Sequence, residues 1–299
     1  MSIIPNLPLF VKRFAHQKTL LPHSFRLCYN KFMYLIIDVG GTKTLLALFS
    51  AHGRIVKKYK FKTPDTKTEF LGILKSSLIA FSSSYEPKIR QIIVAVPGVI
   101  KNNVALNFDN RYWKNLDFAT ELKKLFTCPI TLKNDSDLAT LYESKNIKGL
   151  ALFLNISTNI GGGLAKKGQL TRNSNTFAPG HIRYIFEGKN REWQDIASAK
   201  AIGKKYGKEA TSVRGREAYS DIAFRISLGL PHLIQKYHPD VIIIGGPMAK
   251  QFIHIHSMLK KDVVDFLPRT KNLPRIAAAK RPLESVIYGG YLYAKKLKA

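Results

Sequence analysis

Four short motifs in this sequence could bind phosphate or move a proton. They are the segment from Asp38 to Lys43, the pair Asn134-Asp135, the segment 158–163 and the pair Gly245-Gly246. Glycine lets a backbone approach a phosphate closely, and the unpaired amides of such a turn can point at phosphate oxygens. The first motif taken alone is equally compatible with a plain hairpin turn, so its order relative to the other three carries the argument.

Strand-sized apolar runs place two of these motifs at the ends of strands. Tyr34 to Val39 predicts a buried strand that ends in the first glycine turn. Leu150 to Ile156 predicts another, which ends in a glycine-rich turn from Ser157 to Gly163. A polar residue lies near the end of each strand, Asp38 in the first and Asn155 in the second. This partial repeat predicts two related lobes.

Further strands and helices alternate along both halves, which predicts an α/β fold. A capping box at Thr66 to Glu69 opens a helix whose apolar face continues to Phe81. Pro231 predicts a kink in a long helix over 216–237. The other expected strands are 44–49, 54–61, 91–96, 130–132 and 241–245, and the other expected helices are 117–126, 134–146, 193–206, one after 246 and one after 282.

Composition bounds the class of protein. The chain has 299 residues, of which 45% are apolar, and a length of this kind predicts about two domains. Cys28 and Cys128 are too few for a disulfide framework or a cysteine-rich metal site, which favours a reducing cytoplasmic location. No apolar run approaches the roughly 18 residues that a membrane span needs, so no membrane partner is expected.

The chain is strongly basic, with 48 lysines and arginines against 20 aspartates and glutamates and a net charge of +28. The basic residues are scattered in ones and twos, which is typical of a solvated lysine-rich surface, while a surface for a polyanion stays open. Residues 1–32 are basic and lack acidic residues. We interpret them as an N-terminal extension that is loosely attached or precedes the true start, with a transit peptide as the alternative.

Neither a Walker-type G-x-x-x-x-G-K-[ST] nor a Rossmann G-x-G-x-x-G segment occurs, so a phosphate site would have to use hairpins. The ordered set of four motifs resembles the ROK family of sugar kinases over residues 34–297. Further segments carry the resemblance: Val96-Pro97-Gly98, Asn110 with Trp113, Gly180-His181, Ala197-Ser198 and Tyr288-Gly289-Gly290.

The resemblance implies a two-lobed, actin-like (RNase H-like) α/β fold with the active site in the cleft between the lobes. The boundaries expected here are 33–133 for the N-terminal lobe and 134–282 for the larger C-terminal lobe. A C-terminal helix, 283–299, is expected to pack back on the first lobe.

The resemblance also implies roles for single residues. Asp135 matches the general base that takes a proton from the sugar hydroxyl, although capping of a helix is a second reading of that residue. Asp38 matches the acidic residue near the Mg²⁺ ion, which it would reach through water. The implied nucleotide-binding set is Asp38, Gly40, Gly41, Thr42, Lys43, Thr158, Gly161, Gly245 and Gly246, and the implied sugar-binding set is Asn110, Asn134, His181, Gln194 and Asp195.

Several positions depart from the family pattern. Many members have a glutamate three residues before the histidine, where this chain has Ala178, and another glutamate at the position of Gln194. Asp195 could substitute for the second if the register shifts. Residues 183–193 hold no cysteine, so no structural zinc is expected. Because two carboxylates are lost on the sugar side, specificity for glucose does not follow from the resemblance.

The expected activity is therefore ATP- and Mg²⁺-dependent phosphorylation of a hexose or hexose derivative. Polyphosphate is the alternative donor and would require a basic strip leading to the phosphate site. A sugar sensor without turnover is a second alternative, which the intact Asp135 disfavours. The family's transcriptional repressors carry a DNA-binding segment longer than the 33 residues before Tyr34, so specific nucleic-acid binding is not expected. A homodimer is an expectation of the resemblance alone.

Overall fold

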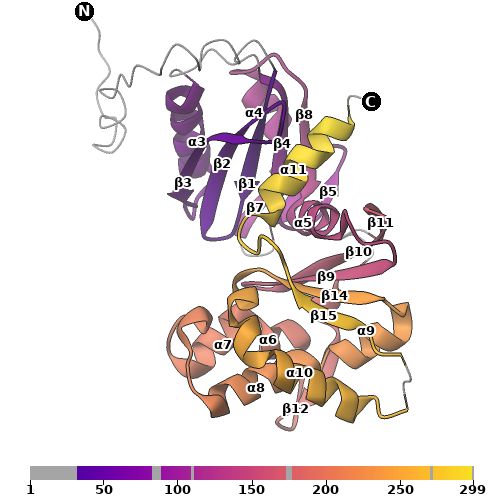
Figure 1. Cartoon of the computed structure of the whole chain (residues 1–299). Coiled ribbons are helices and arrows are strands. Elements are labelled where there is room, and N and C mark those ends of the chain that lie inside the picture. Colours follow the sequence, from indigo (N-terminus) through magenta and orange to yellow (C-terminus); the bar gives the residue numbers. More distant parts are fainter. Residues whose placement is uncertain (1–31, 83–88, 109–110, 173–176, 270–271, 298–299) are drawn as a thin grey trace, which may run out of the picture. The chain divides into compact units, whose positions relative to one another are not determined.

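The computed structural model describes residues 32–82, 89–108, 111–172, 177–269 and 272–297. The expected extension, residues 1–32, lies outside the described residues except for Phe32. The chain divides into two compact units, residues 1–133 with 294–299, and residues 134–293 (Figure 1). Each unit is described by itself.

Unit 1 is built on a five-stranded sheet. Its strands are β1 (Met33–Val39), β2 (Lys43–Ser50), β3 (Ile55–Lys62), β4 (Ile89–Val96) and β8 (Ile130–Asn134), in the order β3-β2-β1-β4-β8. Strand β1 pairs antiparallel with β2 and parallel with β4, and β2 pairs antiparallel with β3. The first three strands, β1 to β3, therefore form an antiparallel meander.

Helix α3 (Lys67–Ser82) covers one face of this sheet. Phe70, Leu74 and Leu78 of the helix are buried in one apolar cluster with Leu35 and Ile37 of β1. The three- and four-residue spacing of the helix side chains meets the two-residue spacing of the strand, as the sequence predicts.

A smaller three-stranded sheet adjoins the same cluster, in the order β5 (Ile100–Lys101), β6 (Val104–Phe108) and β7 (Arg111–Leu116). Helix α4 (Phe118–Lys123) follows it, and the Asp117 side chain accepts a hydrogen bond from the Thr120 amide at its start. The Trp113 indole stacks near Phe70, with ring centroids 4.6 Å apart, and donates to the Asp65 carbonyl at 2.8 Å.

Unit 2 repeats the sheet of unit 1. Its strands are β9 (Leu150–Ile156), β10 (Ile160–Lys166), β11 (Gln169–Arg172), β14 (Val241–Gly245) and β15 (Arg275–Ala278), in the order β11-β10-β9-β14-β15. Strand β9 pairs antiparallel with β10 and parallel with β14, as β1 does with β2 and β4. The register also repeats, because Asp38 is paired with Leu45 and Asn155 with Gly161. The internal repeat predicted from Asp38 and Asn155 is confirmed.

Both faces of the unit 2 sheet are covered. Alternate residues of β9 enter different clusters, Leu152 and Leu154 on one face and Ala151 and Phe153 on the other. The second face is covered by α5 (Asp135–Ser144), and α11 (Ser285–Lys296) also contributes to it. The helices of the first face are α6 (Trp193–Ala197), α7 (Ala199–Tyr206), α8 (Arg216–Ser227), α9 (Leu230–Tyr237) and α10 (Phe252–Phe266), as Figure 1 shows.

Short elements complete this unit. The strands β12 (Arg183–Phe186) and β13 (Lys189–Glu192) form a separate hairpin, which the sequence analysis did not predict. The remaining elements are short 3₁₀ helices, η1 (Pro179–His181), η2 (Ala210–Ser212) and η3 (Pro247–Gln251).

Two long helices predicted from the sequence are each broken in two. The helix predicted over 193–206 is interrupted at Ser198, whose hydroxyl accepts from the Ala201 amide at 3.1 Å and so begins α7. The helix predicted over 216–237 is interrupted after Ser227 and resumes at Leu230, with Pro231 in its first turn. Gly229 lies so close to the Trp193 ring that a side chain there would overlap it.

The Tyr184 hydroxyl provides a test of this packing. It is buried on β12 without a hydrogen-bond partner among the described residues, and burial raises the pKa of Tyr184 to about 12. Tyr184→Phe should therefore keep or raise the free energy of unfolding, by up to about 1 kcal/mol. Urea unfolding followed by circular dichroism measures the change.

Tyr206→Phe is the matched control. The Tyr206 hydroxyl donates to Asp221 Oδ2 at 2.9 Å, so its removal should lower the free energy of unfolding by about 1 kcal/mol. Equal destabilisation by both substitutions would contradict the assignment of Tyr184 as an unsatisfied group.

Candidate active site

The first glycine hairpin joins β1 to β2 in unit 1. The Gly40 amide donates to the Lys43 carbonyl at 3.1 Å, and a Cβ at Gly40 would lie 2.9 Å from that oxygen. Thr63, after β3, donates from its amide to the Thr42 carbonyl at 3.0 Å and from its hydroxyl to the Gly40 carbonyl at 2.9 Å. The turn is thereby fixed from the neighbouring strand. Half-buried Asp38 lies on β1 just before it.

Asp135 is the first residue of α5 in unit 2. Asn134 caps this helix, because its Oδ1 accepts from the amides of Ser136 at 2.8 Å and Asp137 at 3.3 Å. Asp135 Oδ1 also accepts from the Ser136 amide, at 2.6 Å. The cap is therefore supplied mainly by Asn134. The positive end of the helix dipole also favours the negative charge of Asp135.

Strand β10 lies directly against the first turns of α5. A Cβ at Gly161 would lie 2.7 Å from the Ser136 hydroxyl, and one at Gly163 would lie 2.7 Å from that of Thr140. The glycine-rich turn predicted over 157–163 is wrong in extent, because β10 begins at Ile160 and only residues 157–159 form the turn. These two glycines serve close helix packing, which brings the second hairpin to Asp135.

Gly245 and Gly246 lie beside the same hairpin. Gly245 ends β14 and is paired with Asn155 of β9. Gly246 has φ +70°, and a Cβ there would lie 2.6 Å from Asn155 Oδ1 and 2.7 Å from the Ile156 carbonyl. A side chain at Gly246 would be strained both by its dihedral angle and by the space. Unit 2 thus brings together the second hairpin, with Thr158 and Gly161, and the Gly245-Gly246 turn.

The predicted sugar-binding residues His181 and Gln194 lie next to each other. Gln194 Nε2 is 3.4 Å from His181 Nδ1, and both contact Glu192, at 2.7 and 3.0 Å respectively. Gly180 packs against the Ile160 carbonyl and the Gln194 side chain so closely that only glycine fits. Ile160 begins β10, and the next residue of that strand, Gly161, packs against Ser136 of α5. His181 and Gln194 therefore lie beside the start of the strand that packs on α5.

Other predicted site residues are placed less closely. Asp195 is exposed on α6, and it is Gln194, not Asp195, that contacts His181. Asn110 lies outside the described residues. Asp38 and the hairpin from Gly40 to Lys43 belong to unit 1 and are described only within it.

Glu192 was missed by the sequence analysis. Its signal was its place two residues before Gln194, where a replacement for the lost carboxylate could have been sought. Burial raises the pKa of Glu192, but hydrogen bonds from His181 and Gln194 outweigh this effect and hold the pKa below its ordinary value. The residue is therefore an ionised carboxylate at neutral pH.

A metal ion bound here would have few ligands from the protein. In the part of the chain that the structure describes, no three His, Cys, Asp or Glu side chains are grouped as metal ligands. Magnesium usually keeps several waters and binds proteins through one or two carboxylates together with substrate phosphates. The single carboxylate of Asp38 next to a glycine hairpin fits that mode of binding.

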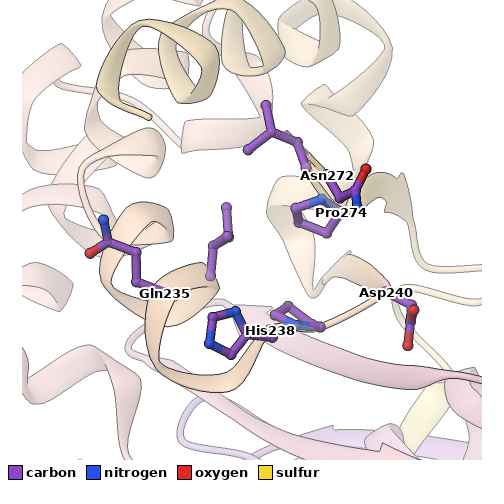
Figure 2. A pocket seen from close by; sticks show the side chains of 8 residues that line it. Gln235, His238, Asp240, Asn272 and Pro274 are labelled. Carbon is purple, nitrogen blue, oxygen red and sulfur yellow. The ribbon is translucent and has the colours of Figure 1, made fainter. Parts of the chain in front are cut away.

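A separate pocket of about 330 Å³ lies at the other end of the unit 2 strands. Figure 2 shows Gln235 and His238 at the end of α9, Asp240 before β14, and Asn272 and Pro274 before β15 around it. Ligands of parallel α/β sheets bind at the carboxyl ends of the strands, whereas this pocket is at the amino ends of β14 and β15. It is not part of the candidate site.

No helix among the described residues is long and apolar enough to cross a membrane.

Comparison with protein families decides the class of the chain. The model of the ROK family matches residues 34–296, which include every motif described above. The chain belongs to the ROK family.

Named ROK kinases are among its relatives. A fructokinase of Lactococcus lactis subsp. cremoris is 26% identical over 261 residues, which cover 81% of this chain and 87% of that protein. An N-acetylmannosamine kinase of Escherichia coli O139:H28 is 30% identical over 244 residues, covering 72% of this chain and 83% of that protein. The predicted enzyme class, a carbohydrate kinase, is confirmed.

The predicted fold is confirmed as well. A ROK family glucokinase from Streptomyces griseus, solved with glucose and AMPPNP, superposes with a TM-score of 0.73 at 17% identity, covering 88% of this chain and 99% of that one. The chain has the two-lobed, actin-like fold of these ROK structures.

The cap of α5 gives a stability test in this ROK protein. Asn134→Ala and Asn134→Ser leave cavities of nearly the same size, but only serine keeps an oxygen that can accept from the amides of the first turn. The alanine variant should have a free energy of unfolding about 1 kcal/mol below that of the serine variant. Urea unfolding of the two proteins measures the difference, and equal values would show that Asn134 does not stabilise the helix through its cap.

Proposed function

We propose that this ROK protein transfers the terminal phosphoryl group of ATP to a hydroxyl of a hexose or hexose derivative, with Asp135 as the general base. The observation that carries the proposal is the packing of β10 on α5. Asp135 lies at the helix start, and the next residue, Ser136, packs against Gly161 of β10. The same strand begins at Ile160, whose carbonyl lies against Gly180, beside Gln194.

Asp135 would accept the proton of the attacking sugar hydroxyl. Its Oδ1 is oriented by the Ser136 amide at 2.6 Å, and the helix start favours the ionised form that a base requires. Phosphoryl transfer depends mostly on positioning and on neutralisation of charge, so one oriented carboxylate is sufficient base chemistry.

The donor phosphates would lie against the two hairpins. The turns that follow β1 and β9 are equivalent in the repeated sheet, with Lys43 and Gly161 on the strands that return from them. Backbone amides of such turns can point at phosphate oxygens. The Gly245-Gly246 turn, next to Asn155, supports contact with the adenosine moiety. A bound Mg²⁺ would neutralise phosphate charge, and Asp38 would hold it through water.

On the sugar side, Asn134, His181 and Gln194 are the proposed ligands of hydroxyl groups. The relatives are named for fructose and N-acetylmannosamine, and the superposed kinase was solved with glucose. The acceptor is therefore proposed only as a hexose or hexose derivative. A homodimer and a cytoplasmic location stay predictions.

Asp135→Asn tests the base. The substitution keeps the size of the side chain and an oxygen for the Ser136 amide, so folding should be unchanged while kcat falls by about 100-fold or more. ADP release from ATP and Mg²⁺ is measured against glucose, mannose, fructose, N-acetylglucosamine, N-acetylmannosamine and allose.

The matched control is Asp265→Asn, which removes an exposed carboxylate on α10. It should turn over the same sugar at the wild-type rate. Wild-type protein that binds a sugar by calorimetry but turns over none of the panel would contradict the kinase proposal and favour a sensor.

A second candidate is a polyphosphate donor, favoured by a strip of lysines in unit 1. The edge strand β3 carries three exposed lysines, Lys58, Lys60 and Lys62. Because they are two residues apart, their side chains lie on the same face of the sheet. Lys62 is paired with Lys43 of the first hairpin, and Lys60 is paired with Leu45, which is paired in turn with Asp38. The strip therefore begins at the phosphate hairpin and lies within about 10 Å of Asp38, two strand spacings away.

Lysines on an edge strand also prevent pairing with other chains, so the donor must be tested directly. If polyphosphate is the donor, Lys60→Gln with Lys62→Gln should lower kcat/KM for polyphosphate at least tenfold and that for ATP less than threefold. Coupled assays with each donor measure this. Lys260→Gln with Lys261→Gln, a pair exposed on α10, is the control, and parallel losses with both donors would reject the strip as a polyphosphate site.

A further inference from the structure

The Glu192 carboxylate, at the end of β13, joins the two side chains proposed to contact the sugar. Its Oε2 lies 3.0 Å from His181 Nδ1 and accepts from Gln194 Nε2 at 2.7 Å. The Arg183 guanidinium lies 3.6 Å from its other oxygen, Oε1. The His181 side chain keeps 62% of its surface exposed, whereas that of Glu192 keeps 27%.

The chemistry of an ionised carboxylate determines which His181 nitrogen carries a proton. A carboxylate only accepts hydrogen bonds, so at 3.0 Å the facing Nδ1 must be the donor. Neutral His181 is then protonated at Nδ1 and leaves Nε2 as an acceptor. A neutral histidine side chain in water favours the opposite form, with the proton on Nε2, so the carboxylate reverses the ordinary preference.

The same oxygen determines the orientation of the Gln194 amide. Its nitrogen must face Glu192, because two facing oxygens would repel each other. The amide oxygen Oε1 then lies on the side of Gly180, where a Cβ would be only 2.8 Å away. Glu192 therefore turns an acceptor atom of His181 and one of Gln194 away from itself.

The carboxylate is not needed to close the β12–β13 hairpin. Four residue pairs, from Arg183 with Glu192 to Phe186 with Lys189, form its backbone ladder. The Trp193 amide donates to the Ile182 carbonyl at 2.8 Å at the open end. Near the turn, Arg225 of α8 lies over the Phe186 ring at 4.8 Å and 3.7 Å from Glu187. The hairpin is thus attached to the unit by contacts that do not involve the Glu192 side chain.

We propose that Glu192 is a positioning residue that fixes His181 in the Nδ1–H form and orients the Gln194 amide, so that both present acceptors to sugar hydroxyls. The statement about the sugar rests on the proposed function. The statement about His181 does not, because it concerns the protein without ligand. An acceptor pair of this kind fits a polyol, whose hydroxyl groups donate.

Nitrogen-15 NMR of the histidine side chains tests the first statement in the full-length protein. Above the pKa of the imidazole, His181 should show the Nδ1–H form in the wild type and mainly the Nε2–H form in Glu192→Ala. The His181→Asn variant assigns the signal by its absence. Glu187→Ala removes another carboxylate of the same hairpin, exposed and paired with Arg191 and Arg225, and should leave the His181 form unchanged.

Kinetics test the second statement. Glu192→Ala should raise KM for the sugar at least tenfold, while KM for ATP stays within about twofold of the wild type and kcat within about threefold. Glu187→Ala should change none of these. If circular dichroism shows that Glu192→Ala does not fold, Glu192→Gln replaces it, because it keeps the size of the side chain but removes the negative charge that makes the hydrogen bonds from His181 and Gln194 strong.

The outcomes separate the two proposals. The same His181 form in wild type and variant would overturn the positioning role, whatever the activity. A changed form with an unchanged KM for the sugar would overturn its role in sugar recognition. A changed form in a protein that phosphorylates no sugar would leave the positioning role in place and reject the kinase proposal.

Discussion

The packing of α5 on β10 is the constraint on which the rest of the candidate site depends. Helix and strand lie so close that there is no room for a Cβ at Gly161 or Gly163. On its other side, α5 meets α11 at Gly289, which leaves no room for a Cβ against the Leu138 carbonyl. The buried Glu143 carboxylate accepts from the Lys280 and Arg281 amides before α11 begins. Asp135 is thus held from two directions.

The repeated sheet places one tight hairpin in each unit, and these hairpins are the candidate phosphate-binding turns. In each unit a central strand ends in a tight turn and returns antiparallel, so the turn projects at the carboxyl end of the parallel strands. Asp38 and Asn155 occupy equivalent registers. The acidic member fits a hydrated cation, whereas the neutral Asn155 packs against Gly246 and shapes the neighbouring turn. The two turns share one backbone geometry, and the different side chains of Asp38 and Asn155 give them different chemistry.

The central strands of both sheets could be predicted from the sequence, because β1, β9 and β14 are buried on both faces and give continuous apolar runs. The start of α5 also has a local signature, although the sequence suggested Asp135 as its cap and the structure shows Asn134 in that position. The helix break at Ser198 was not predicted. The break near Gly229 lies two residues before the kink predicted at Pro231, and the Trp193 ring of another helix packs against Gly229 there. The segment from Gly161 to Gly163 was predicted as a turn because glycine is ordinarily a turn residue. Here Gly161 and Gly163 are required by the helix α5, which packs across the strand.

Glu192 shows why the sugar side was harder to predict than the phosphate side. Phosphate contacts rely on backbone in turns, which glycine marks in the sequence. Sugar contacts rely on side chains whose relation is set by tertiary structure. Here His181 ends a 3₁₀ helix, Glu192 ends a strand, and Gln194 is the second residue of an α-helix. A family position that changes from glutamate to glutamine does not remove the carboxylate from the neighbourhood. In this chain a carboxylate lies two residues earlier, at Glu192, where it contacts the His181 and Gln194 side chains at 3.0 and 2.7 Å.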